Sequence, residues 1–389
     1  MITACGVGTE DNWSAMAAGI SGIKEIESFD ASKYRGKYGG EVHGFIPPAV
    51  ENLKQVRLDR STFMLIHTVH QALVQAGASD ATQGEDVLVS LGTTLGGMLS
   101  GQAFHKEVIR KGLDRARVSL ISDYLAHYQP VNIMREFGLR GDTVTFSNAC
   151  ASGTNAIGYG YRCIRSGEYD LAVCGGYDTM SEFTFAGFNA LMAVSPTLCR
   201  PFDKNRDGLV LGEGAGIVVL EEMQHALDRR ADMLAEVAGY GESADAYHMT
   251  SPDPTGKQAS NAMNKALMDA GCPEIDYINA HGTGTELNDI MEASAIRKSF
   301  GSRAETIPVS SIKPMVGHIL GGAGAVEAIV SILAIRNKAF PPNLNYETPD
   351  RECDINIVRK VTDGNVKTVL SNSFGFGGAN ASIILREYV

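Results

Sequence analysis

The stretch TFSNACASGTNAI, residues 145–157, places a cysteine where a strand-like apolar run gives way to a helix-like one. Cys150 has alanine, serine and glycine as neighbours, and these small residues leave room for another molecule to reach its sulfur. From Ser152 onward the apolar residues keep helical spacing, so the cysteine is expected close to a helix N-terminus. The unpaired N–H groups and the positive dipole end of a helix favour a thiolate there. The pattern therefore predicts that Cys150 is a nucleophile.

Two histidines lie in settings that suit a partner for this thiol. His281 follows the strand-like run DYINA and precedes GTGT, so it is expected at a strand end, facing a cleft. His318 lies in KPMVGHILGGAG, a loop of small residues that opens a helix. A histidine beside a cysteine can transfer protons or donate a hydrogen bond during nucleophilic catalysis. Neither histidine has an i,i+4 partner suited to a metal, and zinc would block the nucleophile, so we expect no metal.

Four further side chains stand in the same group of motifs. Lys313 follows the strand-like run TIPVSS, where its charge could support a thiolate or a carboxylate. Glu327 interrupts the apolar run GAVEAI, and burying it requires a cation, for which Lys313 is the natural candidate. Phe374 and Phe376 alternate with glycine in NSFGFGGAN. They are either core aromatics in a turn or part of a mobile gate whose backbone N–H groups face the sulfur.

The elements around these residues occur twice in the chain. ALVQAG at residues 72–77 is followed by DVLVSLGTT, and ALMDAG at residues 266–271 is followed by DYINAHGTGT. LGEGAGIVVLEE at residues 211–222 resembles FGFGGANASIILRE at residues 374–387. These two matches, together with a looser one around Cys150 and His318, occur in the same order and indicate an internal duplication.

The repeated unit reads as strands alternating with helices. Buried strands such as DVLVSL and LAVCGG alternate with helical stretches, which predicts α/β units with parallel sheets. The segment around Cys150 has a looser counterpart around His318, again strand, small-residue loop and helix. We expect a boundary near residue 223, with an N-terminal half at 1–223 carrying the cysteine. The C-terminal half at 224–389 would carry the histidine pair and the phenylalanine loop. The two halves would share one core.

The composition limits the partners and the compartment. The 389 residues carry a net charge of −11, which argues against nucleic acid or an anionic membrane as the main partner. No apolar run approaches the roughly 20 residues of a membrane span. The N-terminal sequence MITACGVGTEDNW lacks the pattern of a secretory signal. The seven cysteines form no CxxC pair or zinc-finger spacing, so we expect free thiols in a cytoplasmic protein.

Several motifs resemble those of the β-ketoacyl-acyl carrier protein synthases. They are SNACASG around Cys150, HGTGTELND from His281, KPMVGH followed by GGAGAVE, NSFGFGGAN, and RPFDKNRDGLVLGEGAG at residues 200–216. The similarity runs in order through essentially the whole chain and is most specific to the elongating condensing enzymes of fatty acid and polyketide synthesis. The resemblance implies a thiolase-like fold, with two similar α/β halves in a layered α-β-α-β-α arrangement, usually as a homodimer.

The same resemblance implies a reaction. Cys150 would take an acyl group as a thioester from the phosphopantetheine of an acyl carrier protein. A malonyl carrier protein would then lose CO2, and the resulting carbanion would attack the thioester. His281 and His318 would assist decarboxylation and hold the developing enolate oxygen. Lys313 would support them electrostatically, accompanied by Glu327.

The resemblance also implies how the substrates are held. Backbone N–H groups at Cys150 and Phe376 would form the oxyanion hole, with Phe376 as the gate, and Thr283 and Thr285 would contact pantetheine. No other cofactor is implied.

ENLKQVRLDR resembles the family's region for docking the carrier protein, through Lys54, Arg57 and Arg60. Arg200, before PFD, is a further candidate. The alternative is that these four are solvated surface charges.

Two departures leave the substrate open between a fatty acid and a polyketide or polyene. The family more commonly reads GAAG and GFGGTN where this chain reads GGAG and GFGGAN, and the segment between ALMAVSP and RPFD is short.

Three other classes of protein are alternatives to this interpretation. A thiolase using coenzyme A substrates needs a second cysteine in a glycine-rich turn, whereas Cys353 lies in DRECDINIV. A non-catalytic partner of the chain-length-factor type lacks the nucleophile. A cysteine hydrolase needs only one histidine and access for water.

Overall fold

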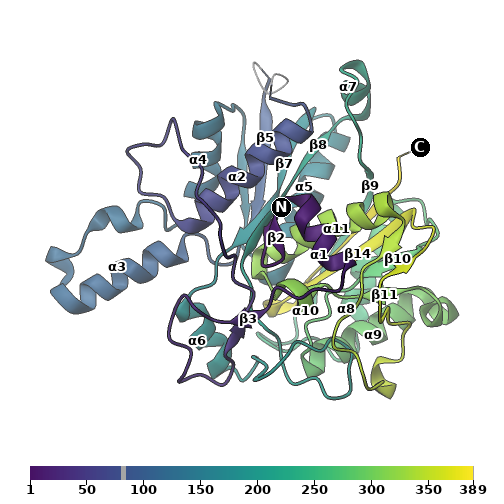
Figure 1. Cartoon of the computed structure of the whole chain (residues 1–389). Helices are drawn as coiled ribbons and strands as arrows, with labels where there is room; N and C mark the ends of the chain where they lie inside the picture. Colours follow the sequence, from purple (N-terminus) through teal and green to yellow (C-terminus); the bar gives the residue numbers. More distant parts are fainter. Residues whose placement is uncertain (80–84, 389) are drawn as a thin grey trace.

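Two β-sheets organise the chain in the computed structural model, which describes residues 1–79 and 85–388 (Figure 1). The first sheet has six strands in the order β2 (Gly6–Val7), β1 (Ile2–Thr3), β8 (Gly214–Glu221), β7 (Leu171–Asp178), β5 (Val87–Gly92) and β6 (Thr143–Phe146). The second has five in the order β11 (Val309–Ser310), β10 (Tyr277–Asn279), β14 (Thr368–Gly375), β15 (Ala379–Arg386) and β9 (Glu236–Ala244).

The two sheets repeat one pairing pattern, which confirms the predicted duplication. In the first, β5 runs parallel to β6 and β7, while β8 is antiparallel to both β7 and β1. In the second, β10 runs parallel to β11 and β14, while β15 is antiparallel to both β14 and β9. The predicted parallel pairing holds around β5 and β10, but both sheets are mixed because β8 and β15 each return antiparallel beside their predecessor.

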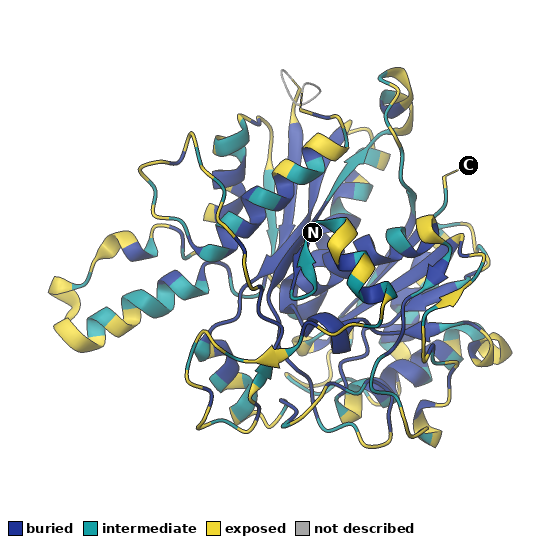
Figure 2. Cartoon of the chain, in the orientation of Figure 1, coloured by how far each residue is buried: buried dark blue, intermediate teal, exposed yellow. Residues whose placement is uncertain are grey.

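Helices complete a five-layer arrangement. Two central helices, α5 (Ser152–Arg165) and α11 (Ala323–Asn337), pack against strands of both sheets. The outer face of the first sheet carries α2 (Arg60–Gln75) and α4 (Tyr128–Phe137). The outer face of the second carries α8 (Lys257–Asp269), with α9 (Glu286–Phe300) beside it. Figure 2 shows that the strands and the helices between them are mostly buried. The layered α-β-α-β-α arrangement predicted from the sequence is therefore confirmed.

The central helix α11 corrects the expectation about apolar runs. The stretch Leu320–Asn337 is long and apolar enough to cross a membrane, with a mean hydropathy of 1.3. However, 78% of it is buried inside the protein. A helix covered by a sheet on each side needs apolar residues all round, which accounts for its composition.

The remaining elements surround this body. They are the helices α1 (Thr9–Ala17), α3 (Met98–Lys111), α6 (Glu182–Ala190), α7 (Met223–Asp228) and α10 (Lys313–Val316), the strand pairs β3 (Lys24–Glu25) with β4 (Tyr38–Gly39) and β12 (Ala339–Phe340) with β13 (Thr362–Asp363), and the 3-10 turns η1 (Leu113–Arg115), η2 (Val118–Ile121), η3 (Ala149–Ala151), η4 (Gly301–Glu305), η5 (Leu320–Gly322), η6 (Arg351–Cys353) and η7 (Phe376–Gly378). The helix α3 projects from the body as an arm (Figure 1). Met223, near which the boundary is expected, is the first residue of α7, between the last strand of the first sheet and the first strand of the second.

Candidate active site

Cys150 lies on a tight turn between β6 and α5. The turn is η3, in which Ala149 adopts a left-handed conformation with φ +58°. The turn packs closely on the end of β5, since a Cβ added to Gly92 would come within 2.3 Å of the Ser152 backbone. The sulfur is therefore held at the start of α5, as predicted, and the residue is only 7% exposed.

The thiol itself differs from the prediction. Burial raises the pKa of Cys150 to about 12, and negative charge on Asp178 and Glu327 adds to this effect. The Lys313 ammonium and the backbone N–H of Phe376 lower the pKa without offsetting the burial. Burial thus favours the thiol in the free enzyme at neutral pH, in contrast to the thiolate expected at the helix start.

The structure brings both predicted histidines to this thiol. The sulfur and one ring nitrogen of each histidine lie within 4.8 Å of one another. His281 follows β10, and His318 lies between α10 and η5, so both come from the second half of the chain. Their rings are 5.3 Å apart between centroids and meet edge to face at 82°. The cysteine of one half thus meets the histidine pair of the other.

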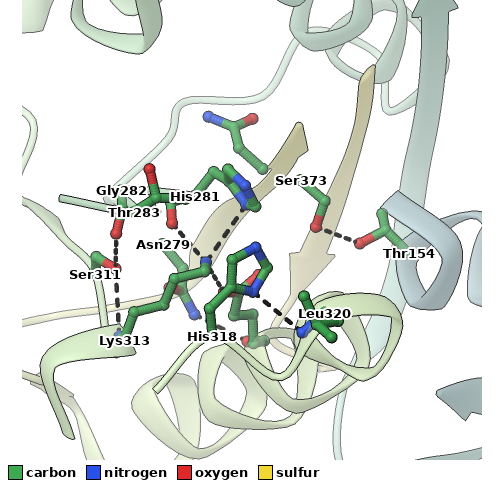
Figure 3. Close-up of polar contacts among 12 residues, drawn as sticks. Thr154, Asn279, His281, Gly282, Thr283, Ser311, Lys313, His318, Leu320 and Ser373 are labelled. Carbon is green, nitrogen blue, oxygen red and sulfur yellow. Dashed lines mark hydrogen bonds and ion pairs between the residues drawn. The ribbon is translucent and has the colours of Figure 1, made fainter. Parts of the chain in front are cut away.

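Hydrogen bonds define which nitrogen of each histidine carries its proton. The backbone N–H of Leu320 donates to Nδ1 of His318 at 3.1 Å. The Lys313 ammonium lies 3.4 Å from Nδ1 of His281 and acts there as the donor (Figure 3). Both Nδ1 atoms therefore accept, which leaves the proton on Nε2 of each ring. Burial lowers the pKa of both histidines well below the usual range, so both rings are neutral N–H donors.

Lys313 and Glu327 meet as the sequence predicts. Both are about 1% exposed, and the ammonium forms an ion pair with the Glu327 carboxylate. The same ammonium donates to the backbone oxygen of His281 at 2.5 Å. Burial raises the pKa of Glu327, and the charge of Lys313 opposes that shift. The pair fixes the turn that carries His281 and places a positive charge beside its ring.

The phenylalanine loop separates into a core residue and an exposed one. Phe374 is buried in β14 and packs edge-on against the His281 ring at 5.8 Å between centroids. Phe376 is 37% exposed and stacks on Phe188 of α6 at 5.7 Å between centroids. A Cβ added to Gly375 would lie 3.1 Å from the Cys150 nitrogen, so the two backbone segments are adjacent. The interpretation as a core aromatic therefore holds for Phe374, whereas the gate role of Phe376 stays a prediction.

The two threonines lie together at the start of α9. The hydroxyl oxygens of Thr283 and Thr285 are 2.8 Å apart. Thr283 is buried, and Thr285 precedes the first residue of the helix.

The four basic residues suggested for docking have different surroundings. Lys54 and Arg57 are exposed. Arg60 begins α2 and forms an ion pair at 2.8 Å with Glu213, whose side chain is buried. The Arg60 side chain is 33% exposed, so it combines a structural contact with a partly exposed charge, and its docking role stays a prediction. Arg200 donates to the Thr197 hydroxyl at 2.8 Å.

Two buried carboxylates beside the site were not predicted. Glu292 of α9 accepts the backbone N–H groups of His281 at 2.9 Å and Gly282 at 2.7 Å. Asp178, at the end of β7, accepts the backbone N–H of Gly321 at 2.7 Å. Burial raises the pKa of Glu292 to about 7 and that of Asp178 to about 6. Their sequence context could have indicated them, because each is an acidic residue among otherwise small and apolar residues. Glu292 begins EASAI, and Asp178 ends LAVCGGYD.

A cysteine and two histidines at these distances also have the donor set of a zinc site. A histidine that binds a metal normally donates its second ring N–H to a carboxylate or a carbonyl. Here the second nitrogen of each ring faces a donor instead, Leu320 N–H or the Lys313 ammonium. The surroundings suit a thiol facing two N–H donors better than a metal.

Comparisons with known proteins agree with the motifs. The family model described as the N-terminal domain of β-ketoacyl synthase matches residues 1–226, and the C-terminal domain model matches residues 234–347. The 3-oxoacyl-[acyl-carrier-protein] synthase 2 of Coxiella burnetii is 38% identical, over 100% of this chain and 96% of its own length. The protein of that name from Synechocystis sp. is 37% identical over 100% and 96%, and that of Staphylococcus aureus (strain N315) is 36% identical over 97% and 94%.

Solved structures show the same similarity. The ishigamide ketosynthase/chain length factor superposes with a TM-score of 0.93 at 35% identity, over 100% of this chain and 97% of that one. A β-ketoacyl synthase from Burkholderia phymatum STM815 has a TM-score of 0.92 at 34% identity, with the same coverage.

The duplicated halves and the shared site of one cysteine and two histidines define a condensing enzyme of the thiolase-like fold. Within that class, the chain belongs to the β-ketoacyl synthase family. The family and fold predicted from the sequence motifs are confirmed.

Proposed function

We propose that this enzyme extends acyl chains by decarboxylative condensation, using Cys150 as the acyl carrier and the two histidines as hydrogen-bond donors. The observation that carries the proposal is the pair of neutral rings, each with its Nδ1 already accepting, beside one thiol. The similarity to 3-oxoacyl-[acyl-carrier-protein] synthases places the chemistry in the elongation of fatty acid or polyketide-type chains.

Loading is the first step. The sulfur of Cys150 attacks the carbonyl carbon of an acyl thioester, and the carbon–sulfur bond to the carrier breaks. Since burial favours the protonated thiol in the free enzyme, the proton has to leave the sulfur as the new carbon–sulfur bond forms and has to reach the departing thiolate of the carrier. The backbone N–H groups of Cys150 and Phe376 would donate hydrogen bonds to the transient oxyanion.

Decarboxylation is the second step. The malonyl thioester oxygen receives the Nε2–H groups of His281 and His318. The bond to the carboxylate breaks, CO2 leaves, and the electron pair forms an enolate held by these two donors. This step needs no proton transfer, so neutral rings with a lowered pKa suit it. The positive charge of Lys313 next to His281 supports the developing negative charge.

Carbon–carbon bond formation completes the cycle. The enolate carbon attacks the thioester on Cys150, the oxyanion collapses, and the cysteine thiolate leaves and regains one proton. The products are CO2 and a chain longer by two carbons on the second carrier. No cofactor is needed other than the phosphopantetheine arm of that carrier, which Thr283 and Thr285 would contact at the entrance.

The partner in both half-reactions is an acyl carrier protein. A solved neighbour at 27% identity and a TM-score of 0.89, AntDE:AntF, is a ketosynthase in complex with its acyl-carrier protein, which supports this assignment. Exposed Lys54 and Arg57 give the carrier a local positive surface on a chain of net charge −11.

We also infer a homodimer in the cytoplasm. Among the described residues, β6 pairs only with β5, so its other edge offers backbone groups to a second copy. Each of the seven cysteines is a free thiol, as in a reducing compartment. Sedimentation at micromolar concentration would give the mass of two chains.

The assignment is tested by measuring loading and condensation separately. Hexanoyl-carrier protein should acylate wild-type enzyme at Cys150, and Cys150→Ala should abolish both acylation and condensation. His281→Ala and His318→Ala should still accept hexanoate but lose condensation with malonyl-carrier protein by about 100-fold or more, the scale of a lost oxyanion donor. Rapid release of free hexanoate would instead indicate a hydrolase, and near-normal condensation in both histidine variants would contradict the mechanism.

A further inference from the structure

We infer that Asp178 is a positioning residue that fixes His318 relative to Cys150, by tying together the chain segments beneath the two. It touches no reacting atom and acts through hydrogen bonds to the backbone. The inference rests on the proposed function, because it concerns the step in which His318 acts as a donor.

The carboxylate of Asp178 accepts four hydrogen bonds from two separate segments. On the loop after β5, it accepts the Thr93 hydroxyl at 2.6 Å and the N–H groups of Thr94 and Leu95, both at 2.9 Å. From η5 in the other half of the chain it accepts the Gly321 N–H at 2.7 Å. The side chain is fully buried, so these bonds are shielded from water. Asp178 thus ties the ends of β5 and β7 to η5.

The bond to Gly321 lies next to the one that orients His318. Leu320 precedes Gly321, and its N–H is the donor to Nδ1 of His318. Leu320 has φ +52°, a conformation that a leucine rarely adopts, so the turn needs outside support. Losing the bond to Asp178 would free the following peptide and allow Leu320 N–H to leave the ring.

The same segments also contact the first turn of α5, which carries Cys150. A Cβ added to Gly321 would come within 2.5 Å of the Thr94 nitrogen. A Cβ added to Gly153 would come within 2.8 Å of the Gly321 oxygen. Backbone therefore packs on backbone from β5 through η5 to α5, and a shift of η5 changes the distance between Cys150 and His318 directly.

Only a carboxylate satisfies this set of donors. Oδ2 accepts two backbone N–H groups, and Oδ1 accepts one backbone N–H and a hydroxyl. An asparagine of the same shape would turn its NH2 group towards at least one N–H, leaving two buried donors facing each other. Asp178→Asn is therefore a small change in volume and a large change in hydrogen bonding.

The experiment compares two steps in Asp178→Asn, hexanoyl transfer to Cys150 and condensation of the loaded enzyme with malonyl-carrier protein. Loading should stay within about threefold of wild type, because the sulfur and its oxyanion donors remain. The condensation kcat should fall by about tenfold to 100-fold, with little change in KM. Thr93→Val, which removes one of the four bonds without changing shape, should give a smaller loss of the same kind. If Asp178→Asn does not fold, Thr93→Val serves as the test variant in its place.

Asp123 provides a matched control. It is also fully buried, accepts the Asp59 N–H at 2.8 Å and the Thr62 hydroxyl at 2.6 Å, and has its pKa raised by burial to about 6. Its partners lie around α2 and α4, on the outer face of the first sheet. Asp123→Asn should lower thermal stability while keeping the ratio of condensation to loading. If Asp178→Asn slows loading and condensation by the same factor, or leaves the ratio of condensation to loading as in wild type, the positioning role is refuted.

A spectroscopic reading separates this inference from the proposed function. In protein labelled with 15N-histidine, His318 should show the Nε2–H tautomer in wild type and in Asp123→Asn, and a mixture of tautomers in Asp178→Asn. If wild-type enzyme fails to condense, the proposed function falls but this reading still tests the position of His318. An unchanged His318 tautomer in Asp178→Asn would refute the inference, whatever the activity.

Discussion

In the free enzyme, burial raises the pKa of Cys150 and lowers the pKa of the two histidines beside it, which favours a neutral thiol next to neutral imidazoles. The reaction proposed for Cys150 therefore depends on what the substrate brings into the site rather than on a sulfur ionised in advance. A neutral thiol among neutral donors also leaves the resting enzyme poorly reactive towards electrophiles that do not fill the site.

The charge state of Cys150 can be measured directly. With a pKa of about 12, the thiolate fraction should rise about tenfold per pH unit from pH 6 to 9. Alkylation of Cys150 by iodoacetamide, followed by peptide mass spectrometry, should rise in the same way and show no plateau. Modification of the exposed Cys272 in the same samples controls for the reagent. A plateau below pH 8 would mean that the thiolate is already formed in the free enzyme.

The sequence identified the reacting residues but not their charges. Small neighbours and strand-end positions were enough to single out Cys150, His281 and His318. The pKa of Cys150 depends on burial by segments from both halves, which no local pattern contains. The ion pair of Arg60 could not be predicted for the same reason, since its partner Glu213 lies 153 positions away in the chain.

At the scale of elements, two matching turns carry the site. Ala149 in η3 and Leu320 in η5 both precede a central helix, and both have positive φ, +58° and +52°. The first turn presents Cys150, whereas the second presents Gly321 at the corresponding position and supports His318. The duplicated unit thus supplies a nucleophile in one copy and a scaffold in the other.

Close backbone contact at these turns predicts a strong effect of Gly92→Ala. The added Cβ would lie 2.3 Å from a Ser152 backbone atom, so β5 and α5 would have to separate. We expect a loss of about 1–3 kcal/mol or more in the free energy of unfolding, measured in urea, together with slower loading of Cys150. Gly187→Ala is the control, because its Cβ would meet nothing within 4 Å. Equal stability of the two variants would show that β5 and α5 have room to move.

Element positions were largely predictable, but strand directions were not. The order of strand, small-residue turn and helix around Cys150 could be read from spacing and glycines. A fully buried apolar run gives no sign of its direction, because both faces are covered whichever way it runs. The antiparallel return of β8 and β15 was therefore missed. Asp178 was missed because its partners come from two other turns.

For the whole molecule, whose net charge is −11, the binding of a carrier protein depends on where positive side chains are exposed. Lys54→Glu with Arg57→Glu should raise the KM for hexanoyl-carrier protein by about five- to tenfold, and added salt should weaken the wild-type interaction. Turnover of a small hexanoyl thioester that needs no carrier should stay unchanged. Lys257→Glu with Lys298→Glu, exposed residues on α8 and α9, makes the same charge change elsewhere. Similar effects of the two pairs would mean that docking senses only overall charge.

The interleaving of the halves has a consequence for how the protein is made. The residues of the candidate site lie far apart along the chain, and Phe376 comes after the cysteine and both histidines. The strand β15 follows Phe376, yet it lies inside the second sheet, between β14 and β9. A ribosome therefore has to release residues 368–386 before that sheet can close and bring its histidines up to the thiol. Until then the growing chain carries Cys150 without the two histidines beside it.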